Sequence, residues 1–217
     1  MERETQIKSK KRIVEHGEVF TSDREVKAML DLVKDETQRI ESRFLEPACG
    51  NGNFLVEILR RKLEIVSQRY GKNKLDFERY AVIAVGSIYG VELLIDNVIE
   101  CRERLFSILF KFYSERFSCD GSQKYREAIR FILNRNILCG DALTLKTTEG
   151  KPIVFSEWSL VSGSNIKRRD YTFTELMEAN RVGQMSIFQA AMRFDDKALG
   201  FIQDPVKEYP ITHYEYE

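Results

Sequence analysis

The stretch from Phe44 to Leu55 restricts the fold of this chain more than any other part of its sequence. A short apolar strand ends in the carboxylate of Glu46, and a glycine-rich turn around Gly50 and Gly52 opens directly into an amphipathic helix. Glycines in such a turn allow a ligand to lie against bare backbone at the helix N-terminus. The stretch therefore predicts a strand–turn–helix unit that binds a nucleotide-like cofactor, and a tight turn without a ligand is the alternative.

Two common nucleotide-binding patterns do not fit this turn. A dinucleotide fingerprint would have a third glycine three residues after Gly52, where this chain has Leu55. A phosphate-binding P-loop would need Gly-Lys-Ser/Thr, and no such triplet follows Gly52. An oxidoreductase that uses a nicotinamide cofactor is therefore disfavoured.

Strands and helices alternate along the first two-thirds of the chain. A capping box, Ser22-x-x-Glu25, begins the first predicted helix. The region 76–92 would also allow one long strand, but Gly86-Ser87 interrupts it, so a helix followed by a strand is preferred. The patterns predict strands at Phe44–Glu46, Ile88–Glu92 and Asn136–Cys139, and helices at about 23–38, 54–66, 76–85, 96–110 and 122–134.

This alternation predicts an α/β fold with a doubly wound, mostly parallel sheet. Ligands in such folds lie beyond the carboxyl ends of the strands, where Glu46, Glu92 and Asp141 fall. Glu92 could accept both hydroxyls of a ribose, but it follows Glu46 by 46 residues, beyond the roughly 20 of a simple βαβ unit. An extra helix between them would explain this spacing. The alternatives are an exposed strand-end charge for Glu92 and a cap or turn residue for Asp141.

The C-terminal part has a different pattern. Residues 153–161 and 166–173 flank the turn residues 162–165 and predict a β-hairpin, followed by a short helix near 173–180 and a weakly patterned tail from Gly183. We therefore divide the chain into a charged arm (1–15), a cofactor-binding domain (16–150) and a hairpin with its tail (151–217).

Composition limits the remaining possibilities. The chain of 217 residues has no net charge, and a balanced chain should bind DNA poorly by itself. Its four cysteines form no Cys-x-x-Cys pair and only two histidines accompany them, so we expect no metal site and reduced thiols. The sequence shows no apolar run long enough for a membrane span and no signal-peptide pattern, so a cytoplasmic protein is expected.

The run Leu45-Glu46-Pro47-Ala48-Cys49-Gly50-x-Gly52-x-Phe54 resembles motif I of the S-adenosylmethionine (SAM)-dependent amino-methyltransferases that act on DNA adenine in restriction–modification systems. The resemblance implies a Rossmann-like methyltransferase fold with SAM as the cofactor. It assigns contacts with SAM to Glu46, Pro47, Ala48, Gly50, Gly52 and Phe54.

Two further stretches resemble motifs of the same enzymes. Residues 136–143 are similar to the third motif, in which Asp141 would receive the adenine amino group and Ala142 would pack on the ring. Residues 17–22 are similar to the N-terminal motif, and Phe20 and Thr21 would contact the methionine part of SAM. Glu92 and Leu93 complete the predicted cofactor site.

The catalytic motif of these enzymes, Asn/Asp-Pro-Pro-Tyr/Phe, does not occur in this chain, whose four prolines are never adjacent. In related enzymes this motif orients the amine of a flipped base. We therefore predict the SAM-binding part or subunit of an adenine-specific DNA methyltransferase that is inactive alone and has no catalytic residue of its own. A second polypeptide would supply catalysis and target recognition, and DNA would bind through the complex.

Two alternatives remain open. The chain could be a non-catalytic regulatory subunit that binds SAM or S-adenosylhomocysteine (SAH). It could also be a complete methyltransferase for RNA or a small molecule, with a catalytic loop in 150–217. The basic residues Lys8 to Arg12 and Lys167 to Arg169 could face DNA or a partner, although a solvated arm and a solvated edge strand are the simpler interpretations.

Overall fold

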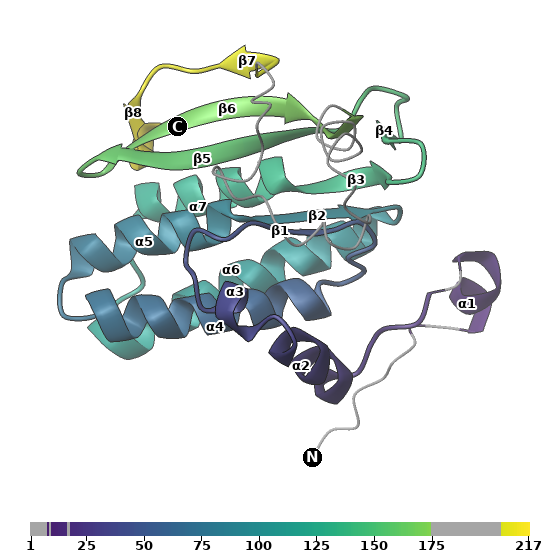
Figure 1. The fold of residues 1–217 in the computed structure, drawn as a ribbon, viewed down its shortest axis with the longest axis horizontal. Helices are drawn as coiled ribbons and strands as arrows, with labels where there is room; N and C mark the ends of the chain where they lie inside the picture. The colour runs from purple at the N-terminus through teal and green to yellow at the C-terminus, as the bar shows by residue number, and fades with distance from the viewer. Residues whose placement is uncertain (1–7, 9, 17, 175–204) are drawn as a thin grey trace.

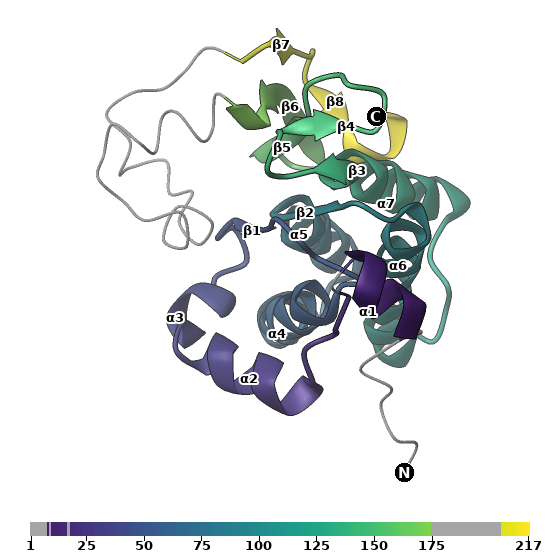
Figure 2. The same ribbon diagram turned by 90° about the vertical axis from the view of Figure 1, so that its right-hand side faces the viewer.

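Three layers make up the part of the chain that the computed structural model describes, which is residues 8, 10–16, 18–174 and 205–217. A mostly parallel sheet lies between a layer of helices and a second, antiparallel sheet (Figures 1 and 2). The mixed α/β architecture agrees with the prediction from the sequence. Among these residues, no helix is long and apolar enough to cross a membrane.

The first sheet has the strand order β1-β2-β3-β4. Strands β1 (Phe44–Glu46), β2 (Ile88–Glu92) and β3 (Ile137–Asp141) are parallel, and β4 (Lys146–Thr147) pairs antiparallel with β3. The parallel strands therefore end at one edge, with Glu46 beside Gly90 and Glu92 beside Cys139. This edge brings together the acidic strand ends that the sequence singled out.

Helices α4 (Asn53–Tyr70) and α6 (Ile95–Phe117) cover one face of this sheet (Figures 1 and 2). Helices α5 (Lys74–Gly86) and α7 (Gln123–Asn136) lie level with the strands and lead directly into β2 and β3. Because the strands lie in chain order, crossovers of one hand place α4 and α6 on the same side. The predicted doubly wound arrangement, with helices on both faces, is not seen in the described residues.

The helix pair α4–α5 accounts for the long spacing between Glu46 and Glu92, as the sequence suggested. Residues 81–85 of α5 are all buried, so the C-terminal half of this helix is apolar around its whole circumference, which is why its sequence could also be read as a strand. Gly86 ends α5 and Ser87 caps it, which confirms the preferred helix followed by a strand.

A buried lysine, Lys62, connects the segments that precede β1 and β2. The Lys62 Nζ donates hydrogen bonds to the carbonyl oxygens of Ile40 (3.1 Å) and Ser42 and to the Ser87 hydroxyl. Burial lowers the pKa of Lys62 to about 7. These bonds tie the loop before β1 to the end of α5, so that both strands start at fixed positions.

The opposite face of the sheet is covered by the predicted β-hairpin, β5 (Val154–Ser162) and β6 (Asn165–Thr172). A second core lies between them, formed by Leu45, Tyr89, Val91, Ile153, Phe155 and Phe173. Strands β7 (Lys207–Glu208) and β8 (Thr212–His213) pair with β6, and the turn η1 (Tyr214–Tyr216) follows. The buried Tyr214 hydroxyl donates to Glu78 of α5 at 3.0 Å, which joins the C-terminus to the helical layer.

The single helix predicted at 23–38 is wrong. The capping box at Ser22 and Glu25 is present, but the chain forms α2 (Asp23–Asp31) and a separate short helix, α3 (Lys34–Thr37). Leu32 points into solvent, and Val33 leaves the helical conformation with φ −123° and ψ 34°, which turns α3 so that Thr37 is buried. No glycine or proline marks this break in the sequence.

Two further differences concern the ends of the chain. The charged arm contains a short helix, α1 (Lys10–His16), that the sequence analysis did not predict. Most of the predicted helix near 173–180 and of the tail from Gly183 lies outside the described residues.

Candidate cofactor-binding site

A cavity of about 540 Å³ opens at the carboxyl ends of the parallel strands. Four segments line it: the N-terminal residues 18–21, the end of β1 with the glycine turn, the end of β2 with the start of α6, and the end of β3 with the two residues after it. All the predicted site residues except Gly52 lie on its wall, namely Phe20, Thr21, Glu46, Pro47, Ala48, Gly50, Phe54, Glu92, Leu93, Asp141 and Ala142.

The glycine turn needs both of its glycines. Gly50 and Gly52 have φ values of 52° and 90°, a conformation that other residues rarely adopt. A Cβ added at Gly52 would lie 2.5 Å from the Cys101 Sγ on α6. Gly52 therefore does not line the cavity, and its missing side chain lets the turn lie against α6.

Two buried thiols lie beneath this turn. Cys49 and Cys101 are both free cysteines, and the neighbouring Cys101 thiol together with burial raises the pKa of Cys49 well above its ordinary value. Cys49 is therefore a neutral thiol that contributes an apolar surface to the cavity.

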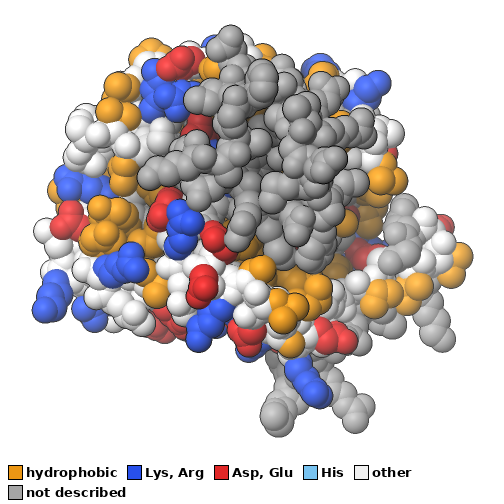
Figure 3. All heavy atoms as spheres, in the orientation of Figure 1, with side chains coloured by type: hydrophobic (Ala, Val, Ile, Leu, Met, Phe, Trp, Pro, Cys, Tyr) orange, Lys and Arg blue, Asp and Glu red, His pale blue; other side chains and the backbone are white. Residues whose placement is uncertain are grey.

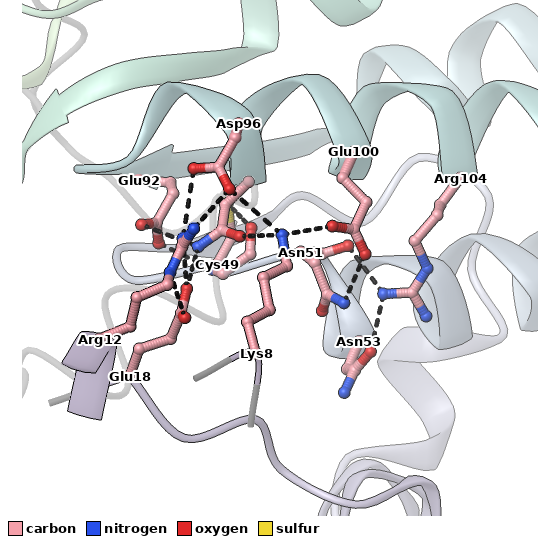
Figure 4. A network of polar contacts seen from close by, with 12 residues as sticks. Lys8, Arg12, Glu18, Cys49, Asn51, Asn53, Glu92, Asp96, Glu100 and Arg104 are labelled. Carbon is pink, nitrogen blue, oxygen red and sulfur yellow. Dashed lines mark hydrogen bonds and ion pairs between the residues drawn. The ribbon is translucent and has the colours of Figure 1, made fainter. Parts of the chain in front are cut away.

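Glu92 joins β2 to the glycine turn and to the start of α6 (Figure 4). One carboxylate oxygen accepts a hydrogen bond from the Gly50 N–H at 2.9 Å. The other accepts from the Leu94 N–H at 3.0 Å and from the Asn97 Nδ2 at 3.4 Å. These bonds fix the carboxylate, and its remaining lone pairs can accept hydroxyl groups of a ligand.

Glu46 is largely buried at the end of β1. Burial raises the pKa of Glu46 to about 7, although a hydrogen bond from the Ala48 N–H favours the ionised form. Within the described part of the chain, Glu46 forms no ion pair. A buried carboxylate in a cavity without a cation favours a ligand that carries positive charge.

The sequence left two roles open for Asp141, a turn residue and an acceptor for the adenine amino group. The structure has Asp141 in a turn and leaves it available as an acceptor. One of its oxygens accepts from the Leu143 N–H at 2.8 Å, which is a turn contact. The residue also lines the cavity beside Ala142 and the fully exposed side chain of Leu143. A carboxylate held by a turn next to apolar side chains could receive an amino group of a planar ring.

The cavity wall is acidic. Its described lining contains four carboxylates, Glu18, Glu46, Glu92 and Asp141, and no lysine, arginine or histidine. Such a wall repels phosphate groups and attracts cations.

The N-terminal segment, residues 18–21, lies against the glycine turn. The Asn53 side chain donates to the Thr21 carbonyl oxygen at 2.8 Å, and the Phe20 ring lies 3.1 Å from the position of a Cβ on Gly50. Phe20 and Thr21 therefore form one wall of the cavity opposite the strand ends.

Helix α6 holds the turn from behind through residues that the sequence analysis missed (Figure 4). The Asn51 side chain donates to Glu100 at 2.8 Å, and Arg104 donates to the Asn51 carbonyl oxygen (2.8 Å) and to the Asn53 side chain (2.7 Å). Glu100 and Arg104 lie one helical turn apart. This spacing is visible in the sequence, but their partners fifty residues away are not.

The basic segment at residues 167–169 does not form a free DNA-binding edge. Arg168 is buried and forms an ion pair with Asp170 at 2.9 Å, so a solvated or DNA-facing side chain is wrong for this residue. Lys167 pairs with Glu208, and Arg169 lies 3.4 Å from Glu157. On the described part of the face shown in Figure 3, basic and acidic side chains are interspersed.

Among the described residues, no group of three or more His, Cys, Asp or Glu side chains could hold a metal ion.

Comparison of the chain with protein-family models, with curated proteins and with solved structures finds no match. The functional inference therefore rests on the geometry of the cavity and on the resemblance of its segments to methyltransferase motifs.

Proposed function

We propose that this chain is the SAM-binding part or subunit of an adenine-specific DNA methyltransferase of a restriction–modification system. The observation that carries the proposal is the acidic cavity beside a glycine turn, with no basic side chain in its described lining. SAM has a sulfonium and an ammonium group against one carboxylate and contains no phosphate. Its net positive charge suits this wall better than the phosphates of ATP or NAD would.

Each part of SAM has a candidate partner in the cavity. The ribose hydroxyls would bind to Glu92, whose oxygens are already oriented by Gly50 and Leu94. The adenine amino group would donate to Asp141, and the ring would lie between Leu93 and Ala142. The methionine part would lie along the glycine turn, near Glu46 and Thr21.

The acceptor and the catalytic motif are proposed to come from elsewhere. Methyl transfer to an exocyclic amine needs groups that accept the amino hydrogens and orient the lone pair toward the sulfonium methyl group. The chain has no Asn/Asp-Pro-Pro-Tyr/Phe segment for this task. The choice of DNA adenine as the acceptor rests on the resemblance of residues 17–22, 45–54 and 136–143 to amino-methyltransferases.

Binding is tested by titration calorimetry with SAM, SAH, ATP and NAD. We expect SAM to bind and the two phosphate-containing compounds not to bind. Replacing Glu92 by Gln should weaken SAM binding by at least about tenfold, because hydrogen bonds to a charged group contribute roughly 1.5–3 kcal/mol. Glu103→Gln is the matched control, since Glu103 lies on α6 and pairs with Arg130 at an exposed site outside the cavity lining.

Catalysis is tested by transfer of a labelled methyl group from SAM to adenine-containing DNA. We expect no transfer by this chain alone and transfer after addition of a polypeptide that carries Asn-Pro-Pro-Tyr and a recognition domain. Transfer by the isolated chain to RNA or a small molecule would favour a complete enzyme. SAM binding without transfer by the pair would favour a regulatory subunit.

A further inference from the structure

The N-terminal arm is bound to the start of α6 by ion pairs (Figure 4). Arg12 lies 2.6 Å from Asp96 and donates to Glu18 at 2.8 Å. Lys8 lies 2.5 Å from Glu100 and donates to the Asn97 side-chain oxygen at 2.7 Å. Two cations of the arm therefore contact three carboxylates at one side of the cavity.

Of the two aliphatic side chains of α1, Ile13 is partly buried and Val14 is not. Val14 of α1 is 86% exposed, so this side chain buries almost no surface against the domain. The Arg12 guanidinium lowers the pKa of Asp96 to about 2, so this carboxylate is ionised throughout the pH range in which the protein would be studied. The attachment should therefore respond to salt rather than to pH.

The contacts of the arm continue to the predicted ribose-binding carboxylate. The Glu18 carboxylate accepts from the Asn97 Nδ2 at 2.6 Å, and the same nitrogen lies 3.4 Å from the Glu92 carboxylate. Asn97 is buried, and because Lys8 donates to its oxygen, its NH₂ group must face the two glutamates. A continuous path thus runs from Arg12 through Glu18 and Asn97 to Glu92.

The positive charge of Arg12 offsets the repulsion between Glu18 and Glu92. Glu18 and Glu92 share one amide group, so two carboxylates lie close together on the cavity wall. Without a cation beside Glu18, the mutual repulsion of the two carboxylates would favour displacement of one of them. Such a displacement would disturb the wall formed by residues 18–21 and the contacts of Glu92.

We propose that Arg12 is a positioning residue for cofactor binding, which neutralises Glu18 and thereby holds Asn97 and Glu92 in place at the cavity wall. The inference deepens the proposed function and rests on it for the identity of the ligand. Arg12 does not itself line the cavity, so its effect reaches the ligand through the other three side chains.

The variants that test this are Arg12→Gln, Arg12→Lys and Lys11→Gln. Lys11 is the matched control, because it lies on the same helix and pairs with Glu15 in solvent, away from the cavity. All three variants should keep the thermal midpoint of the wild type to within a few degrees, since the ion pairs of the arm lie outside the core. A circular-dichroism melt excludes a folding defect before any other measurement.

The first readout is the affinity for SAM, measured by calorimetry. Arg12→Gln should weaken binding on the order of tenfold, a usual coupling between linked sites. Arg12→Lys should recover part of the loss, because the charge remains although the two-pronged contact is lost. High salt should weaken binding to the wild type and to Lys11→Gln more than to Arg12→Gln.

The second readout needs no cofactor. Hydrogen–deuterium exchange of the Gly50 and Leu94 amides reports directly on their bonds to Glu92. These amides should exchange faster in Arg12→Gln than in the wild type or in Lys11→Gln. If the wild type does not bind SAM, the proposed function fails, and the exchange rates alone decide the role of Arg12. Exchange rates in Arg12→Gln equal to those of Lys11→Gln would overturn the inference.

Discussion

A buried carboxylate on the hairpin and a buried carboxylate at the cavity differ in the partners that the protein gives them. On the hairpin, Asp170 accepts hydrogen bonds from Arg168, Ser156 and Tyr209 at 2.6–3.1 Å. At the cavity, the partner of Glu46 among the described residues is the backbone N–H of Ala48. Burial raises the pKa of both carboxyls, but for Asp170 the contacts with Arg168 and Ser156 outweigh it and the pKa lies below its ordinary value.

This difference in partners distinguishes the structural cluster around Asp170 from the candidate binding site around Glu46. Burying a charge is costly unless a partner compensates it, and the hairpin supplies that partner within the chain. In the described part of the chain, the cavity supplies no cation for Glu46, whereas Glu18 is paired with Arg12. A buried carboxylate without a cation, such as Glu46 beside the glycine turn, lowers the stability of the fold. Such a cost is typical of a functional site.

The largest effect is expected from Arg168→Met on the hairpin. The variant leaves Asp170 and Glu217 buried without their cation, so the free energy of unfolding should fall by about 3–5 kcal/mol. Urea unfolding measures this change. Lys167→Met is the control, since the loss of its pair with the solvent-exposed Glu208 should lower the stability much less. Equal losses in the two variants would contradict a special role for the buried cluster.

The next largest effect is expected from Gly52→Ala at the turn. The new methyl group would combine a left-handed backbone with a collision against Cys101, and we expect a loss of about 3 kcal/mol together with loss of SAM binding. Gly150→Ala is the matched control, because Gly150 has a φ of 77° but no atom within 4 Å of the added carbon. Its loss should be about 1 kcal/mol. Adding Cys101→Ala to Gly52→Ala should restore part of the stability.

A smaller effect of opposite sign is expected from Glu46→Gln. Between its ordinary pKa of 4.5 and its folded value of about 7, Glu46 binds more protons in the folded than in the unfolded state. The stability of the wild type should therefore fall as the pH rises through this window. Above pH 7 the variant should be more stable than the wild type by about 2 kcal/mol, allowing for residual exposure of the carboxyl, and below pH 4.5 the two should be equal. If the free energies of unfolding of the wild type and the variant changed in parallel with pH, the Glu46 carboxylate would have a stabilising partner, as Asp170 does.

The smallest effect concerns the pH dependence of binding. Only the ionised form of Glu46 attracts the sulfonium, so SAM affinity should rise as the pH increases through about 7, by at most tenfold per pH unit. SAH has a neutral thioether and should show a weaker dependence. Calorimetric titrations of both compounds over this range measure the difference, and Glu46→Gln should remove it.

Local sequence patterns predicted those parts of the site that lie at the end of a strand or in the turn that follows it. The run 44–55, the strand ending at Glu92 and the residues around Asp141 could be placed because each strand end is set by nearby glycines and apolar residues. Parallel strands then bring these ends to one edge, so that the cavity follows from the order of the elements.

The rest depends on contacts between residues far apart in the chain. Glu18 and Asn97 became part of the wall because the arm folds back on α6, and no local pattern reports a contact across 79 residues. Arg168 looked like an exposed base because it belongs to a run of three basic residues, but it shares a face of β6 with the buried Ile166, and Tyr209 and the C-terminal Glu217 cover it. Among the residues that the structure describes, the hairpin rather than a second layer of helices covers the other face of the sheet, which alternation of strands and helices does not reveal.

The central claim is that the carboxylates at the strand ends hold SAM, and a crystal structure of the chain with SAM tests it most directly. The account predicts electron density for the cofactor in the cavity, with its ribose hydroxyls on Glu92 and its adenine amino group on Asp141. Cofactor density at another place, or a saturated crystal in which the cavity holds only water, would contradict it.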